Sequence, residues 1–142
     1  MAKQKYSVLL VDDSDDDRLF MRRGLDGNPR FVIVGEVVDG EEAIAYLRGE
    51  DYFSDREKYP FPDVVLLDLK MPRVTGHEVL GWLQTQSFEE LFVAVVSGSY
   101  LPIDIEKSLE LGAHVHYEKT ALLQEQEGMV RALEQLLGRK QA

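Results

Sequence analysis

The chain has 142 residues, of which 44% are hydrophobic, and 26 acidic against 16 basic residues give it a formal net charge of -10. Its length and hydrophobic content fit one compact domain with its own core and no second folded domain. The negative charge disfavours binding to nucleic acid or an anionic membrane, and the lack of cysteine excludes disulfides and thiolate metal sites. Near the N-terminus the apolar run is too short for a signal peptide or a membrane span, which predicts a soluble cytoplasmic protein.

Five short apolar runs predict five strands. They cover residues 6–11, 31–37, 63–68, 91–97 and 114–118. Short runs rich in Val and Leu are typical of buried parallel strands. The intervening segments have helical length and pattern, and the predicted helices cover about residues 15–25, 40–47, 74–85, 102–111 and 121–137. This alternation predicts an α/β fold with a doubly wound parallel sheet.

Two of the segments between the strands have further features. Ser14 is the predicted N-cap of the first helix, and Asp15, Asp16 and Asp17 complement the helix dipole in its first turn. We interpret these three acids as facing solvent, outside any site. Residues 49–62 form a long connection with four aromatic side chains, although such connections usually have roughly 2 to 6 residues. A functional loop and a harmless surface insertion are equally compatible with this pattern.

Three acidic residues lie at the ends of two predicted strands. Asp12 and Asp13 directly follow the first strand, and Asp68 ends the third. In open α/β sheets, ligands bind at the C-terminal edge of the strands, where the strand order reverses. Three carboxylates that meet there repel one another unless a cation joins them. The pattern therefore predicts a divalent metal site around one reactive carboxylate, and its alternative is a set of exposed acids without function.

The motifs at the other strand ends complete a pattern that resembles the receiver domains of two-component response regulators. Besides Asp12-Asp13, it consists of Asp68 within Asp68-Leu69-Lys70-Met71-Pro72, Gly76, Ser97 closing the fourth strand and Lys119 closing the fifth. The resemblance covers essentially the whole chain. It implies a flavodoxin-like sheet in the order 2-1-3-4-5 with five helices, built as one receiver domain with a core from Tyr6 to Leu137. No output domain is expected after it.

The resemblance also implies a role for each site residue. Asp68 would accept a phosphoryl group from the phosphohistidine of a sensor histidine kinase. Asp12, Asp13, Asp68 and the backbone carbonyl of Lys70 would hold Mg²⁺, a cation that prefers oxygen ligands. Lys119 would neutralise phosphoryl charge, and the Ser97 hydroxyl would bind the phosphate and act in the switch. The chain would be a phosphoacceptor rather than an enzyme, apart from its own phosphorylation and dephosphorylation.

Two positions depart from the pattern of the family. His116 stands where the family most often has Tyr or Phe, the aromatic switch residue, while Tyr117 is expected on the opposite face of the strand. A titrating imidazole at this position leads to the hypothesis that switching depends on pH near neutrality. Thr120 replaces the proline that commonly follows the lysine in a cis peptide. The Lys119-Thr120 bond is therefore expected to be trans, or cis with strain.

The output would be a protein contact or a phosphotransfer step, with a phosphorelay shuttle or a phosphate sink as alternatives. The face formed by the fourth helix, fifth strand and fifth helix is a candidate homodimer or partner surface, although most of the apolar stripe of the fifth helix is expected to pack on the sheet. The 49–62 connection resembles that of single-domain regulators paired with bacterial phytochrome kinases. DNA binding and membrane binding are not expected.

Two other classes of protein share parts of this pattern. A phosphatase of the haloacid dehalogenase class also uses an aspartyl nucleophile and Mg²⁺, but it normally needs a second acid where this chain has Lys70. A flavodoxin-like electron carrier needs a phosphate-binding loop after the first strand, where Asp12-Asp13-Ser14-Asp15 would repel a phosphate.

Overall fold

The computed structural model describes residues 5–99 and 101–141. Its five strands form one parallel sheet in the order β2-β1-β3-β4-β5, as predicted. The strands are β1 (Tyr6–Val11), β2 (Phe31–Val37), β3 (Val64–Leu67), β4 (Phe92–Ser97) and β5 (Val115–Glu118). The helices are α1 (Asp15–Asp26), α2 (Gly40–Arg48), α3 (Gly76–Gln84), α4 (Pro102–Glu110) and α5 (Leu123–Gln141), with a 3-10 turn η1 (Asp51–Phe53).

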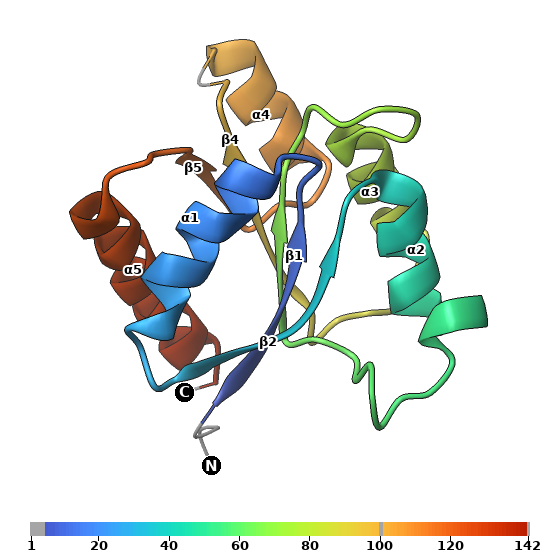
Figure 1. The fold of residues 1–142 in the computed structure, drawn as a ribbon. Helices are drawn as coiled ribbons and strands as arrows, with labels where there is room; N and C mark the ends of the chain where they lie inside the picture. The colour runs from blue at the N-terminus through green and yellow to red at the C-terminus, as the bar shows by residue number, and fades with distance from the viewer. Residues whose placement is uncertain (1–4, 100, 142) are drawn as a thin grey trace.

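Helices cover both faces of the sheet (Figure 1). Side chains alternate between the faces along each strand, as the pleat requires. In β1, Val8 and Leu10 join the core beneath α1 and α5, whereas Leu9 and Val11 join the core beneath α2 and α3. Because both faces are covered, the central strands are apolar at nearly every position, which is why they appear as continuous apolar runs in the sequence.

Two helices have boundaries that differ from the prediction by two residues or more. We predicted that α3 starts at Val74, but it begins at Gly76, because the Thr75 side chain accepts a hydrogen bond from the backbone N–H of Glu78 as the N-cap. Helix α5 begins at Leu123 rather than Ala121 and continues beyond the predicted end at Leu137. Within the described ranges, no helix has the length and apolar character that crossing a bilayer requires.

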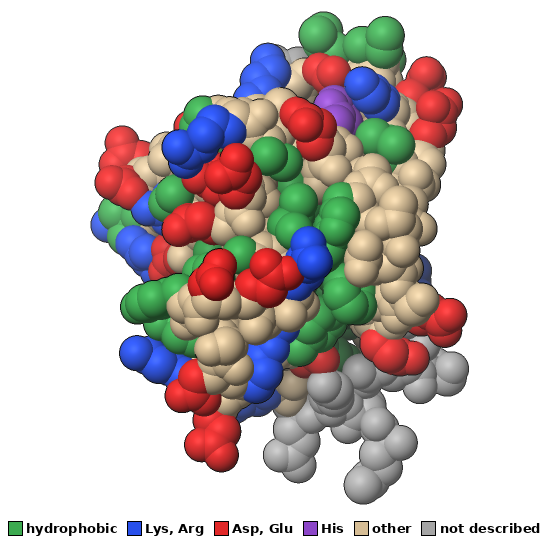
Figure 2. Space-filling view, turned by 90° about the vertical axis from the view of Figure 1, so that its right-hand side faces the viewer, with side chains coloured by type: hydrophobic (Ala, Val, Ile, Leu, Met, Phe, Trp, Pro, Cys, Tyr) green, Lys and Arg blue, Asp and Glu red, His purple; other side chains and the backbone are tan. Residues whose placement is uncertain are grey.

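The long connection between α2 and β3 is folded onto α2. Phe53 and Tyr59 lie with their ring centroids 5.0 and 6.0 Å from that of the buried Tyr46. Arg56 donates hydrogen bonds to the carbonyls of Leu47 and Tyr59, which ties the connection to the C-terminal end of the helix. Figure 2 shows hydrophobic side chains exposed among charged ones on this side of the molecule. The aromatic residues of the connection thus serve at least to pack it in place.

Candidate functional site

The three acids predicted at the strand ends lie together at the C-terminal edge of the sheet. Asp12, Asp13 and Asp68 each offer a carboxylate oxygen, and these oxygens all lie within 4.8 Å of one another. The backbone N–H of Asp68 donates to the carbonyl of Val11, so hydrogen bonds between neighbouring strands fix the acids relative to one another. Asp12 is fully buried, Asp68 is 4% exposed and Asp13 is exposed. One side of the cluster is therefore open to solvent, through Asp13.

The donor set fits a hard divalent cation. Asp12 uses its Oδ1 to accept a hydrogen bond from the backbone N–H of Ser14. Its Oδ2 is buried and accepts no hydrogen bond within the described part of the chain. A buried carboxylate oxygen without a donor is costly unless another group satisfies it. Together with the oxygens of Asp13 and Asp68, it offers the carboxylate ligands that Mg²⁺ and Mn²⁺ prefer.

Lys119 brings the positive charge to this cluster. Its Nζ lies 2.8 Å from Oδ2 of Asp12, outside hydrogen-bond geometry, and 3.3 Å from Oδ2 of Asp68. The Lys119 backbone N–H donates to the carbonyl of Ser97 at 2.8 Å, which fixes where the side chain starts. The Lys119-Thr120 peptide is trans. Of the two alternatives left by the sequence, the structure therefore has the trans bond, and with it the lysine reaches Asp68.

Burial and charge shift the ionisation of the two central groups in the same direction. Burial raises the pKa of Asp68 to about 6. The attraction to Lys119 lowers this pKa, and the repulsion from Asp12 offsets part of that lowering. Burial alone would lower the pKa of Lys119, but its contacts with Asp12 and Asp17 and the charge of Asp68 raise it. Lys119 is therefore protonated at neutral pH, whereas Asp68 holds its proton to a higher pH than an exposed aspartate.

Asp17 belongs to the site, which corrects the interpretation that all three acids of the first helical turn face solvent. Asp15 and Asp16 are exposed, as expected. Asp17, however, accepts a hydrogen bond from Nζ of Lys119 at 2.8 Å. This contact could not be predicted from the sequence. Acids in the first turn of a helix are common because they interact favourably with the helix dipole, so none of the three stands out. Asp17 can be told apart from Asp15 and Asp16 only in the folded structure, where it contacts Lys119.

The loop after β3 runs directly past Asp68. An added Cβ on Gly76 would lie 2.2 Å from the carbonyl oxygen of Asp68, so only glycine lets α3 begin so close to this residue. Arg73 has φ 64° and pairs with the buried Asp39 at 2.5 Å, which holds the loop against the start of α2. Lys70 lies on this loop, two residues after Asp68, and its side chain is exposed.

Ser97 ends β4 and is fully buried. Its hydroxyl oxygen accepts a hydrogen bond from the backbone N–H of Ser99 at 3.1 Å. The Ser99 hydroxyl in turn donates to Asp104 of α4 at 2.5 Å. Ser97 is therefore tied through one residue to the N-terminal turn of α4.

His116 of β5 faces α4, whereas Tyr117 packs into the core on the α1 and α5 side, as predicted. Nδ1 of His116 lies 2.9 Å from the hydroxyl of the buried Ser108, and Nε2 lies 3.1 Å from the carbonyl of Ser99. Because a carbonyl only accepts, Nε2 carries a proton and donates to Ser99. The imidazole thus bridges α4 and the loop after Ser97. The sequence identified His116 but not its two partners.

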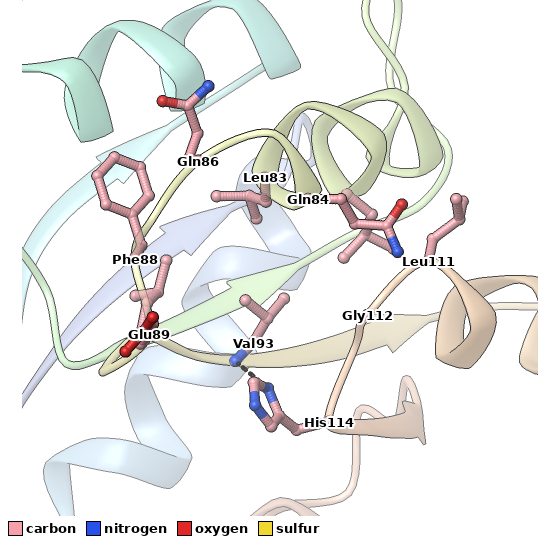
Figure 3. A pocket seen from close by; sticks show the side chains of 11 residues that line it. Leu83, Gln84, Gln86, Phe88, Glu89, Val93, Leu111, Gly112 and His114 are labelled. Atoms are coloured by element: carbon pink, nitrogen blue, oxygen red, sulfur yellow. Dashed lines mark hydrogen bonds between the residues drawn. The ribbon is translucent and has the colours of Figure 1, made fainter.

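A cavity of about 170 Å³ lies at the opposite edge of the sheet, near the starts of β4 and β5. Figure 3 shows its lining, which includes Leu83, Phe88 and Val93, and the hydrogen bond from the Val93 backbone N–H to His114. This cavity shares no residue with the carboxylate cluster. It is therefore separate from the candidate site.

The sequence matches a family of known proteins along most of its length. The family model described as response regulator receiver domain matches residues 8–134. Response regulator Rcp1 of Synechocystis is 30% identical over 89% of this chain and 85% of Rcp1. Protein-glutamate methylesterase/protein-glutamine glutaminase 6 of Anaeromyxobacter dehalogenans is 39% identical over 78% of this chain, but over only 28% of that protein. The chain thus spans less than a third of the methylesterase relative it matches.

Solved structures of the same family have the same fold. The phosphorylated cyanobacterial phytochrome response regulator RcpA has a TM-score of 0.81 and 30% identity over 94% of both chains. Response regulator RPA3017, of red light signaling in R. palustris, has a TM-score of 0.80 and 29% identity over 90% of both chains. Since the family model covers most of the sequence and Rcp1 matches over most of its length, this chain belongs to the response regulator receiver domains.

Proposed function

We propose that Asp68 is the phosphoacceptor of this receiver domain. The observation that carries the proposal is the position of Asp68, a buried carboxylate that belongs to the cluster of three acids and lies 3.3 Å from the ammonium of Lys119. A carboxylate at this position can attack a phosphorus atom while positive charge on both sides stabilises the phosphoryl oxygens. Asp12 and Asp13, whose own oxygens belong to the cluster, would remain unmodified.

The proposed reaction transfers one phosphoryl group from a histidine kinase. The N–P bond of a phosphohistidine breaks, its electron pair stays on the imidazole, and an oxygen of Asp68 forms the new P–O bond of an acyl phosphate. Asp12, Asp13, Asp68 and the backbone carbonyl of Lys70 would hold Mg²⁺, which when bound neutralises charge on the phosphoryl group. Lys119 would donate to a phosphoryl oxygen. Beyond this transfer and the hydrolysis of the acyl phosphate to the free carboxylate and inorganic phosphate, the proposal includes no enzymatic activity.

Ser97 and His116 are proposed to carry the signal to the surface. After transfer, the Ser97 hydroxyl would donate to a phosphoryl oxygen, which draws β4's last residue toward Asp68. The hydrogen bonds that link Ser99 to Ser97 and to Asp104 support a route from that movement to α4. His116 contacts this route at Ser99 and contacts α4 at Ser108.

The hypothesis of a pH-dependent switch stays a prediction, and the His116→Phe variant tests it. A second proton on the imidazole would make Nδ1 a hydrogen-bond donor toward the Ser108 hydroxyl, while Asp104 and Lys107 of α4 and His77 of α3 are the other ionisable groups nearby. We expect the phosphorylation-induced NMR shifts of α4 amides to differ between pH 6 and 8 in the wild type but not in the variant. Equal pH dependence in both proteins would contradict the hypothesis.

We further propose a sensor histidine kinase of the phytochrome type as the phosphodonor, because RcpA is described as a phytochrome response regulator and RPA3017 as part of red light signaling. Output would pass to a downstream protein or a phosphotransfer partner in the cytoplasm, with a relay shuttle or a phosphate sink as alternatives. A homodimer through α4, β5 and α5 is part of the same proposal. The exposed Leu101, Ile103, Leu122 and Leu123 near this face support it.

Incubation with acetyl phosphate and Mg²⁺, followed by intact mass spectrometry, tests the proposed acceptor. We expect one added phosphoryl group in the wild type, which is lost when EDTA removes the cation and when Asp68 is replaced by Asn. The exposed Asp16→Asn variant is the matched control, since it removes the same charge from the same edge and should be phosphorylated normally.

Two outcomes would contradict the proposal. An adduct that persists in Asp68→Asn would assign the acceptor to another residue. If the wild type forms no adduct with either acetyl phosphate or a phosphorylated histidine kinase domain, the chain is not a phosphoacceptor. Turnover of phosphate esters without an adduct would instead favour the phosphatase alternative.

A further inference from the structure

The ammonium of Lys119 has three carboxylate neighbours, and they are not equivalent. Asp12 and Asp17 both lie 2.8 Å from Nζ, and Asp68 lies 3.3 Å away. The contact with Asp17 is a hydrogen bond, whereas Oδ2 of Asp12 accepts none. Asp17 is therefore the neighbour to which the ammonium donates a hydrogen bond, and it is the one that comes from a helix.

Asp17 also differs from the other two acids in its relation to the cation cluster. Asp12 and Asp68 both contribute oxygens to that cluster, whereas Asp17 does not belong to it. A cation held by the cluster would compete with Lys119 for the oxygens of Asp12 and Asp68. It would not compete for the oxygen of Asp17, so this ion pair is the one that can persist when the site is filled.

Both partners of the ion pair are held by regular structure. The backbone N–H of Asp17 donates to the Ser14 hydroxyl at 3.2 Å, as part of the N-cap of α1. The backbone N–H of Lys119 is bound to the Ser97 carbonyl. A lysine side chain has four flexible torsions, and holding its end in one place costs conformational entropy. Because Asp17 is a fixed acceptor, the Lys119 side chain is already ordered, and its conformational entropy already lost, before a phosphodonor binds.

We propose that Asp17 is a positioning residue, which holds the Lys119 ammonium beside Asp68 so that an arriving phosphoryl group meets a cation already in place. Asp17 touches neither Asp68 nor the phosphoryl group in this account and acts only through Lys119. The proposal rests on the proposed function of Asp68 as the phosphoacceptor. It explains why one acid of the first turn of α1 faces the site while its two neighbours face solvent.

The test compares initial rates of phosphorylation by acetyl phosphate at saturating Mg²⁺. We expect Asp17→Ala to react roughly tenfold more slowly than the wild type, because a misplaced charged group weakens transition-state stabilisation. Asp17→Asn keeps an oxygen acceptor and should fall between the two, and Asp17→Glu, which keeps the carboxylate, should recover part of the rate. Asp16→Asn is the matched control and should react at the wild-type rate.

Two further measurements separate positioning from a merely structural role. In a Lys119→Met background, Asp17→Ala should slow the reaction no further, because its effect passes through the lysine. In metal-free protein, the Nζ signal of Lys119 in ¹⁵N NMR should be protected from exchange in the wild type and in Asp16→Asn, and lost in Asp17→Ala. This second readout needs neither a cation nor a phosphodonor.

Each outcome bears on the proposal. Equal rates for the wild type and Asp17→Ala would overturn the positioning role and leave the phosphoacceptor intact. An equal slowing by Asp17→Ala with and without Lys119 would assign Asp17 a structural role, and so would an unchanged Nζ signal. If the wild type itself takes up no phosphoryl group, the proposed function fails first, and the positioning role fails with it.

Discussion

Replacing Lys119 with Met should lower the free energy of unfolding of the metal-free protein at pH 8 by about 3 kcal/mol. The substitution leaves the buried Asp12 and Asp68 without their positive neighbour. Because the pKa of Lys119 is raised by folding, its ion pairs contribute their full stabilisation below its ordinary pKa of 10.5, and pH 8 lies well within this range. Urea unfolding followed by circular dichroism measures the change.

Three comparisons make this result specific. Lys107→Met removes an exposed lysine of α4 and should change stability little. Added Mg²⁺ should recover part of the loss in Lys119→Met, because a cation can replace the missing charge between the acids. Lowering the pH toward 4 should also reduce the loss, because the pKa of Asp68 is about 6 and this carboxylate is then protonated in the folded state. A Lys119→Met protein as stable as the wild type at pH 8 without Mg²⁺ would mean that the acid cluster does not depend on this lysine.

Replacing Asp68 with Asn should have the opposite effect and stabilise the metal-free protein at pH 8. Folding raises the pKa of Asp68 from 3.8 to about 6, so the folded state binds this proton more tightly than the unfolded state. Stability therefore falls as the pH rises from about 3.8 through 6, and an uncharged Asn avoids this loss. At roughly 1.36 kcal/mol per pH unit, the gain above pH 6 is about 3 kcal/mol.

Urea unfolding of the wild type and Asp68→Asn between pH 4 and 8 measures this gain. We expect the difference in unfolding free energy to be largest at pH 7 to 8 and to shrink toward pH 4, where Asp68 is protonated in the folded state and the pH approaches its ordinary pKa of 3.8. Asp16→Asn, an exposed acid on α1, should show no such trend. In the Lys119→Met background the gain should be larger, because the attraction that opposes it is gone. An Asp68→Asn protein less stable than the wild type at pH 8 would contradict the conclusion that burial destabilises the charged form of Asp68.

The architecture follows from the sequence because local patterns and the global fold agree. Every predicted strand lies within one residue of its observed bounds. The central strands β1, β3 and β4 give the clearest signal, because strands buried on both faces are apolar at nearly every position. The helix ends were harder to predict, because a cap depends on contacts across the chain. Val74 belongs to a loop since its carbonyl accepts a hydrogen bond from the backbone N–H of Gly40, a partner 34 residues earlier in the chain.

The site was predictable where the topology alone brings residues together. Asp12 and Asp68 meet because the ends of neighbouring parallel strands must meet. Asp17 and Ser108 were not predictable, because both lie on helices, where the choice of the side chain that faces the site depends on helix rotation and packing. Ser108 is buried, donates its hydroxyl proton to the carbonyl of Ile105 and lies 2.9 Å from Nδ1 of His116, and no periodicity in the sequence marks it as the residue of α4 that faces inward.

The proposed route from Asp68 through Ser97 and Ser99 to α4 leads toward one side of the sheet. Asp12 and Asp68 extend the two strands β1 and β3, which have strand neighbours on both sides, whereas β5 is paired only with β4. Any rearrangement started at Asp68 is expected to follow Ser97 and His116 toward this one edge. A partner that binds near α2 would then meet the same surface in both states, while a partner that binds near α4 would not. Recognition of the kinase and readout of the signal can in this way evolve separately on one small domain.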